Sequence, residues 1–231
     1  MNNISIIPIN NLPEFEPKYD LADEIVKSFS SNNFVLEDKD VIVITQKIVS
    51  KVEDRLIKND NESIEKLIQQ ESLEILRKRG DTVIARTKHG FICANAGIDK
   101  SNIEKGSVLL LPEDPDKTSR DIRKKIEHVL NKKISIIISD TFGRAWRKGQ
   151  TNIAIGSSGI QPLESYIGEK DAFDNELFAT EIAIIDELAG AAELVMKKSD
   201  SIPVAIIRGV NYKYSDLGVK ELIRKEDEDF F

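Results

Sequence analysis

The clearest pattern along the chain is a set of short, almost continuous apolar runs that are rich in β-branched residues. Such runs are typical of strands that are buried on both faces of a sheet. Pro203 precedes one of them and Gly209 follows it, so residues that interrupt regular structure mark both of its ends. We therefore predict buried strands at residues 41–44, 134–138 and 204–207.

Other segments repeat apolar residues at the spacing of one helix face. Asp20 is a favourable first residue for a helix in which Ile25 and Phe29 share a face. Gly80 suits the position just after a helix, so we expect it to end a helix that runs through residues 64–76. The same spacing predicts two further helices, at residues 118–130 and 180–197, of which the second is the most apolar.

The alternation of predicted strands and helices indicates a mixed α+β protein. The chain has 231 residues, of which 40% are hydrophobic, and this is enough to bury a substantial core. No internal repeat, low-complexity tract or Gly/Ser-rich linker divides it. We predict a single α+β domain over residues 1–231, with short buried strands and packed helices, and leave open whether it has two lobes.

The charge balance argues against nucleic acids and membranes as partners. Forty acidic residues outnumber 33 basic ones, so the formal net charge is −7. An acidic surface repels the phosphates of DNA and RNA and the anionic lipids of a membrane. The N-terminus lacks a basic segment followed by a long apolar one, and no run of 18 apolar residues occurs. These features predict a soluble, cytoplasmic protein.

Few residues are suited to a soft metal. Cys93 is the single cysteine, which rules out an internal disulfide, and His89 and His128 are the only histidines. A bound metal would therefore be held by oxygen atoms, as Mg²⁺ and Mn²⁺ are. We interpret Cys93 as a small buried hydrophobic residue rather than a nucleophile, and His89 as a structural or surface residue.

The common nucleotide and protease motifs GxxxxGK[ST], GxGxxG, HExxH and GxSxG are missing. Instead, Asp140 and Thr141 follow the second predicted strand, where a carboxylate and a hydroxyl can hold a divalent ion. Arg144, Arg147 and Lys148 come next and are suited to bind a phosphate or a carboxylate. The alternative is a turn in which Asp140 is a cap and the cations face solvent.

Two further polar segments are candidates for ligand binding. Asp99 and Asn102 follow a run of small residues with two glycines, which lets the backbone approach a ligand closely. Lys47 and Lys51 follow the first predicted strand, where a lysine can bind a phosphate, although most such lysines face solvent.

Asp186 and Glu187 lie in the most apolar predicted helix. Neighbouring helical residues point about 100° apart, so both cannot face one ion equally, and we favour a solvent-facing position. Taken together, the other groups offer oxygen ligands for a divalent ion, several cations and glycine-lined loops. This combination is typical of chemistry on phosphates, where catalysis consists mostly of positioning and charge neutralisation.

Six longer strings of residues occur in a fixed order along the chain. They are TQKIVSK (45–51), CANAGIDKSN (93–102), LLPEDPD (110–116), SDTFGRAWRKGQ (139–150), AIGSSGI (154–160) and DELAGAAELVM (186–196). In these strings the chain resembles the coenzyme F-420:L-glutamate ligase family, also called F-420-0:γ-glutamyl ligase. The likeness extends from about Leu12 to about Asn211, which is nearly the whole chain.

The resemblance implies a GTP-dependent amide ligase of deazaflavin cofactor biosynthesis. GTP would activate the terminal carboxylate of F-420-0 as an acyl phosphate, and the amine of L-glutamate would attack it, giving F-420-1, GDP and phosphate. A second round would add a γ-linked glutamate and give F-420-2. The family also implies two divalent ions, Mn²⁺ or Mg²⁺, help from K⁺, and an intertwined homodimer whose fold is neither P-loop nor ATP-grasp. We expect no C-terminal flavin-reductase-like domain of the kind that some members carry.

Matching motif positions imply the site residues. Asp99 and Asp140 resemble ligands of the first divalent ion, and Thr141 resembles a ligand of the second. Lys51 matches the family's phosphate-facing lysine. The other positions that match nucleotide contacts are Leu12, Pro13, Glu14, Phe15, Gln46, Lys47 and Asn102, together with Met196, Lys197, Lys198, Ser199, Asp200, Ser201 and Ile202 of a loop that closes over GTP.

One departure from the family concerns the second ion. In the loop that begins at Met196, members often have a glycine and then an oxygen-bearing side chain beside that ion, where this chain has Lys197 and Lys198. Lys198 cannot be a metal ligand, so a backbone carbonyl or Asp200 would take its place.

Two alternatives stay open. A ligase with the same mechanism could act on another carboxylate-bearing cofactor. A regulatory protein could bind GTP without catalysing a reaction. Lys198 favours this last idea, whereas the retained Asp99, Asp140, Thr141 and Lys51 argue against it.

Overall fold

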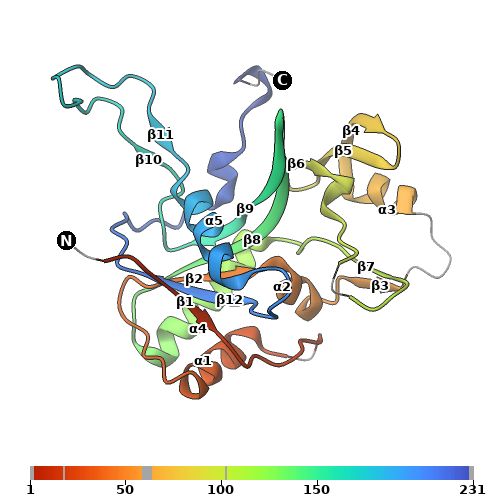
Figure 1. Cartoon of the computed structure of the whole chain (residues 1–231), viewed down its shortest axis with the longest axis horizontal. Helices are drawn as coiled ribbons and strands as arrows, with labels where there is room; N and C mark the ends of the chain where they lie inside the picture. The colour runs from red at the N-terminus through yellow and green to blue at the C-terminus, as the bar shows by residue number, and fades with distance from the viewer. Residues whose placement is uncertain (1–2, 18, 59–63, 102, 229–231) are drawn as a thin grey trace.

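The centre of the molecule is a five-stranded sheet that contains all three strands predicted from the apolar runs (Figure 1). The computed structural model describes residues 3–17, 19–58, 64–101 and 103–228. In spatial order, the strands of this sheet are β1 (Ser5–Ile9), β12 (Val204–Arg208), β2 (Val41–Thr45), β8 (Ser135–Arg144) and β9 (Arg147–Ser158).

β2 and β8 are the parallel pair in this sheet, and the other neighbours run antiparallel. Ile42 lies opposite Ile136 and Ile44 lies opposite Ile138, and all four side chains are fully buried. Burial on both faces explains why these strands appear in the sequence as continuous apolar runs rather than alternating ones. The predicted strands are confirmed, although β8 continues further than expected, to Arg144.

Helices cover both faces of the sheet. α1 (Leu21–Ser31) packs against α4 (Pro115–Leu130), which lies on β8 and β9, while α5 (Ile184–Met196) packs on β9, β12 and β1. Figure 1 shows α5 on the opposite side of the sheet from α1 and α4. Asp20 caps α1 as predicted, because its carboxylate accepts a hydrogen bond from the amide of Asp23 at 3.1 Å.

Two predicted helices begin at other residues than expected. α4 begins three residues early, at Pro115, because Asp114 caps it and proline is favoured in a first turn. α5 begins at Ile184, four residues late, because the residues before it form a strand instead. That strand, β11 (Glu181–Ile182), pairs antiparallel with β10 (Glu164–Ser165).

The helix predicted through residues 64–76, with Gly80 just after it, is wrong in its second half. α3 (Ile64–Glu71) is followed directly by strand β4 (Ser72–Arg79), which pairs antiparallel with β5 (Thr82–Thr87). Gly80, with φ +60°, lies in the tight turn between the two strands and does not end a helix. The strand forms because β5 offers it a ladder of hydrogen bonds, a non-local contact that helical spacing in the sequence does not report.

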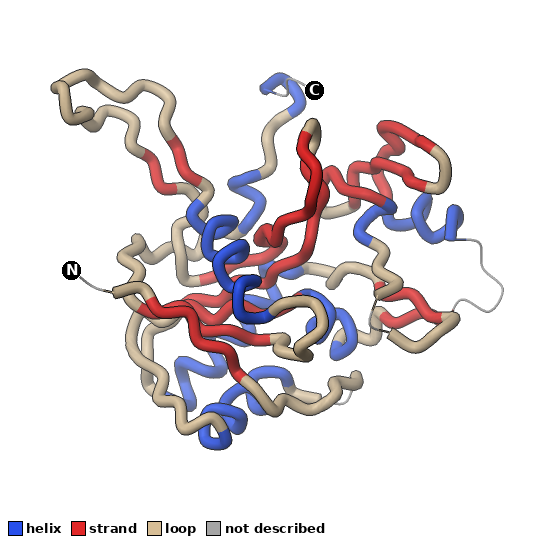
Figure 2. Tube along the Cα trace, viewed as in Figure 1, coloured by secondary structure: helices blue, strands red, loops and turns tan. Residues whose placement is uncertain are grey.

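A second, smaller hydrophobic cluster lies beside the main core. β4, β5 and β6 (Ile92–Ala94) form a three-stranded sheet, and β3 (Leu56–Lys58) pairs with β7 (Ser107–Leu109). Leu67 and Ile68 of α3 are buried in this cluster. Figure 2 shows these strands and α3 to one side of the central sheet.

Short connections carry polar residues to one edge of the central sheet. α2 (Gln46–Val52) begins immediately after β2, so its lysines lie at the carboxyl end of that strand. β8 runs parallel to β2, so Asp140 lies at the same edge. Three short helical turns complete the fold, η1 (Asn95–Gly97), η2 (Val219–Leu222) and η3 (Glu226–Glu228).

Helices and strands are mixed throughout the fold, as predicted. Within the described ranges, no helix combines the length and the apolar character needed to cross a membrane. The β8–β9 hairpin and the segment with β10 and β11 project from the body of the molecule (Figure 2). Trp146, in the turn of the hairpin, is 82% exposed.

Candidate active site

Several of the predicted site residues meet where β2 ends, beside the middle of β8. Lys47, at the start of α2, contacts Asp99, which follows η1. Asp140, in β8, lies within the electrostatic influence of both groups, and Thr141 is the next residue along the strand. The fold therefore brings together residues from three separate sequence motifs.

Asp99 is tied to Lys47 and to Ser101. Nζ of Lys47 donates a hydrogen bond to Oδ2 of Asp99 and lies 2.9 Å from Oγ of Ser101. Oδ1 of Asp99 accepts hydrogen bonds from the amide and the hydroxyl of Ser101, at 2.7 and 2.8 Å. Burial would raise the pKa of Asp99, but these hydrogen bonds outweigh burial and lower the pKa, so the carboxylate is ionised at neutral pH.

Asp140 is a carboxylate without a cation directly beside it. Among the residues that the structure describes, no lysine, arginine or histidine nitrogen lies within 4 Å of its oxygens. Burial raises the pKa of Asp140 to about 6, and the charge of Asp99 acts in the same direction, whereas Lys47 and Lys198 lower it. We call Lys47, Asp99 and Asp140 the carboxylate corner.

The carboxylate corner fits one divalent ion. Its two carboxylates and one ammonium leave a formal charge of −1, and burial penalises that unbalanced charge. In the described part of the chain, no group of three or more His, Cys, Asp or Glu residues could hold a metal ion. The protein thus supplies only part of a coordination shell, and water or phosphate oxygens would complete it, as is usual for Mg²⁺.

Thr141 faces a different set of groups, which we call the hydroxyl corner: Thr141, Asn152, Glu193 and Lys198. The hydroxyl of Thr141 donates to Oδ1 of Asn152 at 2.7 Å, and Nδ2 of Asn152 donates to Oε2 of Glu193 at 2.8 Å. Nζ of Lys198 donates a hydrogen bond to Oγ1 of Thr141 at 2.6 Å. An ammonium group therefore occupies the place beside Thr141, and the residues of this corner do not fit a second divalent ion.

The predicted nucleotide contacts near the N-terminus lie close to α2. Lys51 forms an ion pair with Glu14, whose side chain is 81% exposed. Because such an exposed pair is weak, an anionic ligand can replace Glu14 beside Lys51 at little cost in free energy. Gln46 is fully buried, and its Oε1 accepts a hydrogen bond from Ser50 at 2.8 Å. Phe15 belongs to the main core, against which Leu12 packs, while Pro13 is half-buried and Asn102 lies outside the described residues.

The loop predicted to close over the nucleotide, residues 196–202, begins at the end of α5. Met196 is buried, and Lys197 has φ +50°, which ends the helix. The ammonium of Lys197 lies 3.3 Å from Asp200, whose carboxylate also accepts a hydrogen bond from Ser199 at 3.0 Å. Ser201 is exposed, and Ile202 packs against the main core, so the loop is anchored at both ends.

Arg144, Arg147 and Lys148 lie at the exposed tip of the β8–β9 hairpin. Nη2 of Arg144 donates to the carbonyl of Lys148 at 2.8 Å, which closes the turn. Arg144 is four residues beyond Asp140 along an extended strand, or roughly 13 Å. The structure does not bring these three cations to the carboxylate corner, and their predicted role in anion binding stays a prediction.

The interpretations of Cys93 and His89 are confirmed. Cys93 is buried in the main core, where burial and the nearby charge of Asp140 raise the pKa of its thiol to about 12. It is therefore a neutral packing residue at physiological pH. Nε2 of His89 lies 2.8 Å from the carbonyl oxygen of Pro112, a structural contact between two loops.

The solvent-facing interpretation is correct for Glu187 and wrong for Asp186. Glu187 is exposed, but Oδ1 of Asp186 accepts a hydrogen bond from the amide of Ala154 in β9 at 2.8 Å. Burial raises the pKa of Asp186. The carboxylate points at the sheet because α5 packs on β9, a contact that the sequence spacing did not reveal.

A cavity of about 250 Å³ lies beside this edge of the sheet. Phe142 lines it, and because Phe142 is two residues beyond Asp140 on the same strand, both side chains point to the same face. Phe91 meets Phe142 edge to face, with ring centroids 6.1 Å apart. Arg86 and Arg224 outnumber the one carboxylate of the lining, Asp186, so the cavity suits an anionic molecule with a flat ring.

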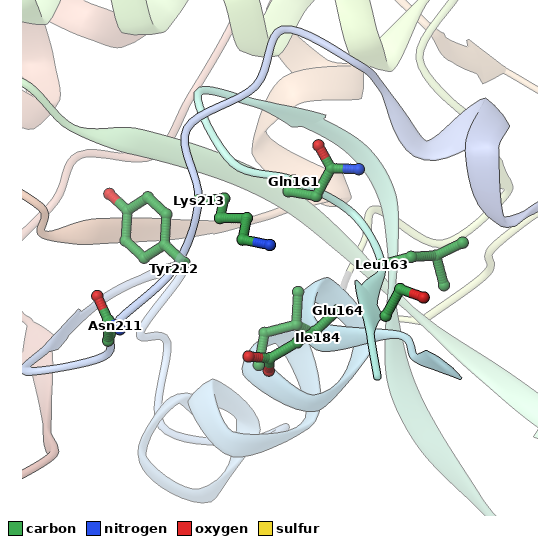
Figure 3. Close-up of a pocket in the computed structure, with 8 residues that line it drawn as sticks. Gln161, Leu163, Glu164, Ile184, Asn211, Tyr212 and Lys213 are labelled. Carbon is green, nitrogen blue, oxygen red and sulfur yellow. The ribbon is translucent and has the colours of Figure 1, made fainter. Parts of the chain in front are cut away.

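Another cavity, of about 310 Å³, lies at the other end of β8 (Figure 3). Tyr212 and Lys213 line it together with Glu164 and Ile184. Tyr212 shares a 2.8 Å hydrogen bond with Ser135, the first residue of β8, which is roughly 16 Å along the strand from Asp140. None of the predicted site residues lines this cavity.

Sequence reasoning missed two residues that the fold places at the site, Asn152 and Glu193. Asn152 lies opposite Thr141 in the β8–β9 ladder and is buried. Glu193 projects from α5, and an acidic residue within the most apolar helix was a signal available in the sequence. For Asn152 no such signal exists, because its importance depends on strand register.

The comparisons with known proteins agree with these motifs. The pattern of the F420-0:Gamma-glutamyl ligase family matches residues 10–209. The coenzyme F420:L-glutamate ligase of Methanocaldococcus jannaschii is 44% identical over 216 residues, which cover 86% of each chain. The protein of the same name from Methanococcus maripaludis strain C7 is 43% identical over 231 residues, covering 92% of this chain and 90% of the other. The chain therefore belongs to the F420-0:gamma-glutamyl ligase family.

Proposed function

We propose that the protein is a GTP- and divalent-metal-dependent ligase that joins L-glutamate to F-420-0. Membership of the family and the names of its relatives support the substrates. The observation that carries the chemistry is the carboxylate corner, where the half-buried Asp140 and Asp99 have one lysine, Lys47, beside them. Such a corner suits a reaction on phosphates, in which negative charge must be gathered and neutralised.

The reaction proceeds in two steps. An oxygen of the F-420-0 carboxylate attacks the γ-phosphorus of GTP, the bond to the bridging oxygen breaks, and GDP leaves. The uncharged amine of L-glutamate then attacks the acyl carbon, a C–N bond forms, inorganic phosphate leaves with the C–O bond electrons, and the amine releases one proton to solvent. A second round on the product would add a γ-linked glutamate.

The side chains around α2 have distinct roles in this scheme. Lys51 exchanges its exposed partner Glu14 for a phosphate of GTP. Asp99 and Asp140 hold Mg²⁺ or Mn²⁺, which neutralises phosphate charge when bound. Lys47 orients Asp99 and adds a positive charge beside it. K⁺ is expected to assist, as the family resemblance implies.

The cavity beside Phe142 is where we place the ring of the acceptor. Its aromatic walls suit a flat deazaflavin, and Arg86 suits the anionic chain that the ring carries. Arg86→Ala should therefore raise KM for F-420-0 about tenfold and leave KM for GTP unchanged. Steady-state kinetics with each substrate varied in turn test this, and an equal rise in both constants would count against the placement.

Mass spectrometry of a complete reaction tests the function itself. Purified protein is incubated with GTP, Mn²⁺, L-glutamate and F-420-0, and the deazaflavin masses are recorded. Product heavier by one or more glutamyl units, lost without GTP or without metal, is the expected result. GDP release without a mass change would redirect the proposal to a different acceptor acid. With neither product nor GDP, a GTP-binding protein without catalysis would replace the ligase.

A further inference from the structure

We propose that the ammonium group of Lys198 supplies the second cation of the active site, so that the chain binds one divalent ion where its family resemblance implies two. The inference rests on the proposed function, because the cation serves the phosphates of GTP. It is carried by the contacts of the hydroxyl corner.

The ammonium of Lys198 is surrounded by oxygen atoms as a bound cation would be. Nζ lies 2.6 Å from Oγ1 of Thr141, 3.2 Å from Oδ1 of Asn152 and 3.0 Å from Oε1 of Glu193. An ammonium has three N–H donors and no acceptor. Three oxygens from three different side chains therefore lie within reach of its donors.

The three oxygens are held in place independently of Lys198. Thr141 and Asn152 lie opposite each other in the β8–β9 ladder and are hydrogen-bonded at 2.7 Å. Asn152 also donates to the second carboxylate oxygen of Glu193 at 2.8 Å, which links the sheet to α5. The cradle is thus part of the packed fold, and Lys198 enters it from the loop that follows α5.

Charge balance separates this corner from its neighbour. In the hydroxyl corner, one carboxylate, Glu193, meets one ammonium, so the formal charge is zero. The carboxylate corner has two carboxylates, Asp99 and Asp140, and one ammonium, Lys47, which leaves a formal charge of −1. A divalent ion is attracted to the carboxylate corner. In the hydroxyl corner it would have to displace the ammonium of Lys198, which already contacts three oxygens.

The position of Lys198 also suits a role at a phosphate. Its side chain is 57% exposed, so its charge lies where a ligand can approach it. The charge of Lys198 also acts on Asp140 of the carboxylate corner. A nucleotide phosphate bound by the metal ion there would therefore meet Lys198 as its next positive charge.

Counting bound Mn²⁺ tests the proposal. The full-length protein is dialysed against Mn²⁺ with saturating GDP, and free Mn²⁺ is measured by electron paramagnetic resonance. We expect one Mn²⁺ per chain in the unaltered protein and two in Lys198→Gln, which replaces the ammonium by an amide oxygen. Two ions in the unaltered protein, or one ion in both proteins, would overturn the proposal.

Lys197→Gln is the matched control. It removes the same charge from the neighbouring residue, whose ammonium faces Asp200 and not the hydroxyl corner. We expect it to keep one Mn²⁺ per chain. A second ion in this variant would show that loop charge alone, rather than occupation of the cradle, sets the count, and would also overturn the proposal.

The count is independent of the success of the proposed function. It needs neither the acceptor nor turnover, so a protein that forms no amide is still measured. Should GDP not bind, the proposed function fails, but the same titration with Mn²⁺ alone still compares the unaltered protein with Lys198→Gln. A second Mn²⁺ gained only by that variant supports the proposal in either case.

Discussion

The carboxylate corner and the hydroxyl corner, which meet at Asp140 and Thr141 of β8, differ in how their charges are balanced. In the carboxylate corner, Asp99 and Asp140 share a single lysine, and burial raises the pKa of Asp140 to about 6. In the hydroxyl corner, only one carboxylate is present, and Lys198 balances it through a hydrogen-bonded cradle. The first corner is therefore short of a cation and the second is complete.

The difference shows how a fold can separate stability from function. A half-buried carboxylate without a cation beside it costs stability, which makes Asp140 a candidate for ligand binding. In a balanced pair, each charge offsets the cost of the other. Adjacent residues, Asp140 and Thr141, thus belong to groups of opposite character because alternate residues of a strand face opposite sides.

The largest expected effect follows from deleting the unbalanced carboxylate. Asp140→Ala should lower kcat by at least about 100-fold while the protein still folds, because the group acts on charge rather than on packing. Turnover at saturating Mn²⁺ and the circular dichroism spectrum are measured together. Asp121→Ala, an exposed change on α4, serves as control. Activity comparable to the unaltered protein would remove Asp140 from the metal site.

The stability cost of Asp140 gives the next largest effect. Its pKa is raised in the folded protein, so the folded state holds the proton more tightly, and this contribution to stability is present below pH 4 and lost as pH rises through about 6. Without metal, Asp140→Asn should raise the free energy of unfolding by up to roughly 3 kcal/mol at pH 8 and by little at pH 4.

Glu193→Gln is the matched change in the balanced corner. Because its charge is paired with Lys198, the variant should lose up to about 1 kcal/mol at pH 8 rather than gain stability. Urea unfolding in the presence of a chelator measures both variants. If Asp140→Asn and Glu193→Gln changed the free energy of unfolding at pH 8 in the same direction, the two corners would not differ in charge balance.

A smaller effect is expected from Lys47, whose ammonium contacts Asp99 where a metal ion would bind. Lys47→Met removes the ammonium that competes with a metal ion for Asp99, so Mn²⁺ should bind about fivefold more tightly in the absence of nucleotide. Calorimetric titration with Mn²⁺ measures the change. Lys51→Met, one turn further along α2, pairs with Glu14 and should leave the affinity unaltered. Weaker binding in Lys47→Met would mean that Lys47 supports the ion instead.

Much of the central sheet could be predicted from the sequence. Strands β2, β8 and β12 are buried on both faces, and this burial leaves a direct mark in the form of continuous β-branched runs. The start of α1 was equally clear, because a capping aspartate acts on an amide three residues away. Such local signals do not depend on which segments become neighbours.

Other features could not be predicted because they depend on distant partners. The residues of β4 have helical spacing, yet they pair with β5. Asp186 was expected to face solvent, and the packing of α5 on β9 turns it inward. The contact between Lys47 and Asp99 joins residues that are 52 positions apart, and no periodicity in the sequence reports it.

The sequence by itself determined the mixed α and β character, the buried strands and the order of motifs that marks the family, because these depend on local composition and spacing. Only the tertiary structure decided which charges are balanced. Lys198 lies 57 residues from Thr141, and Asn152 matters through its place in the β8–β9 ladder. Charge balance depends on distances in space, which are set by strand pairing and helix packing rather than by neighbours along the chain.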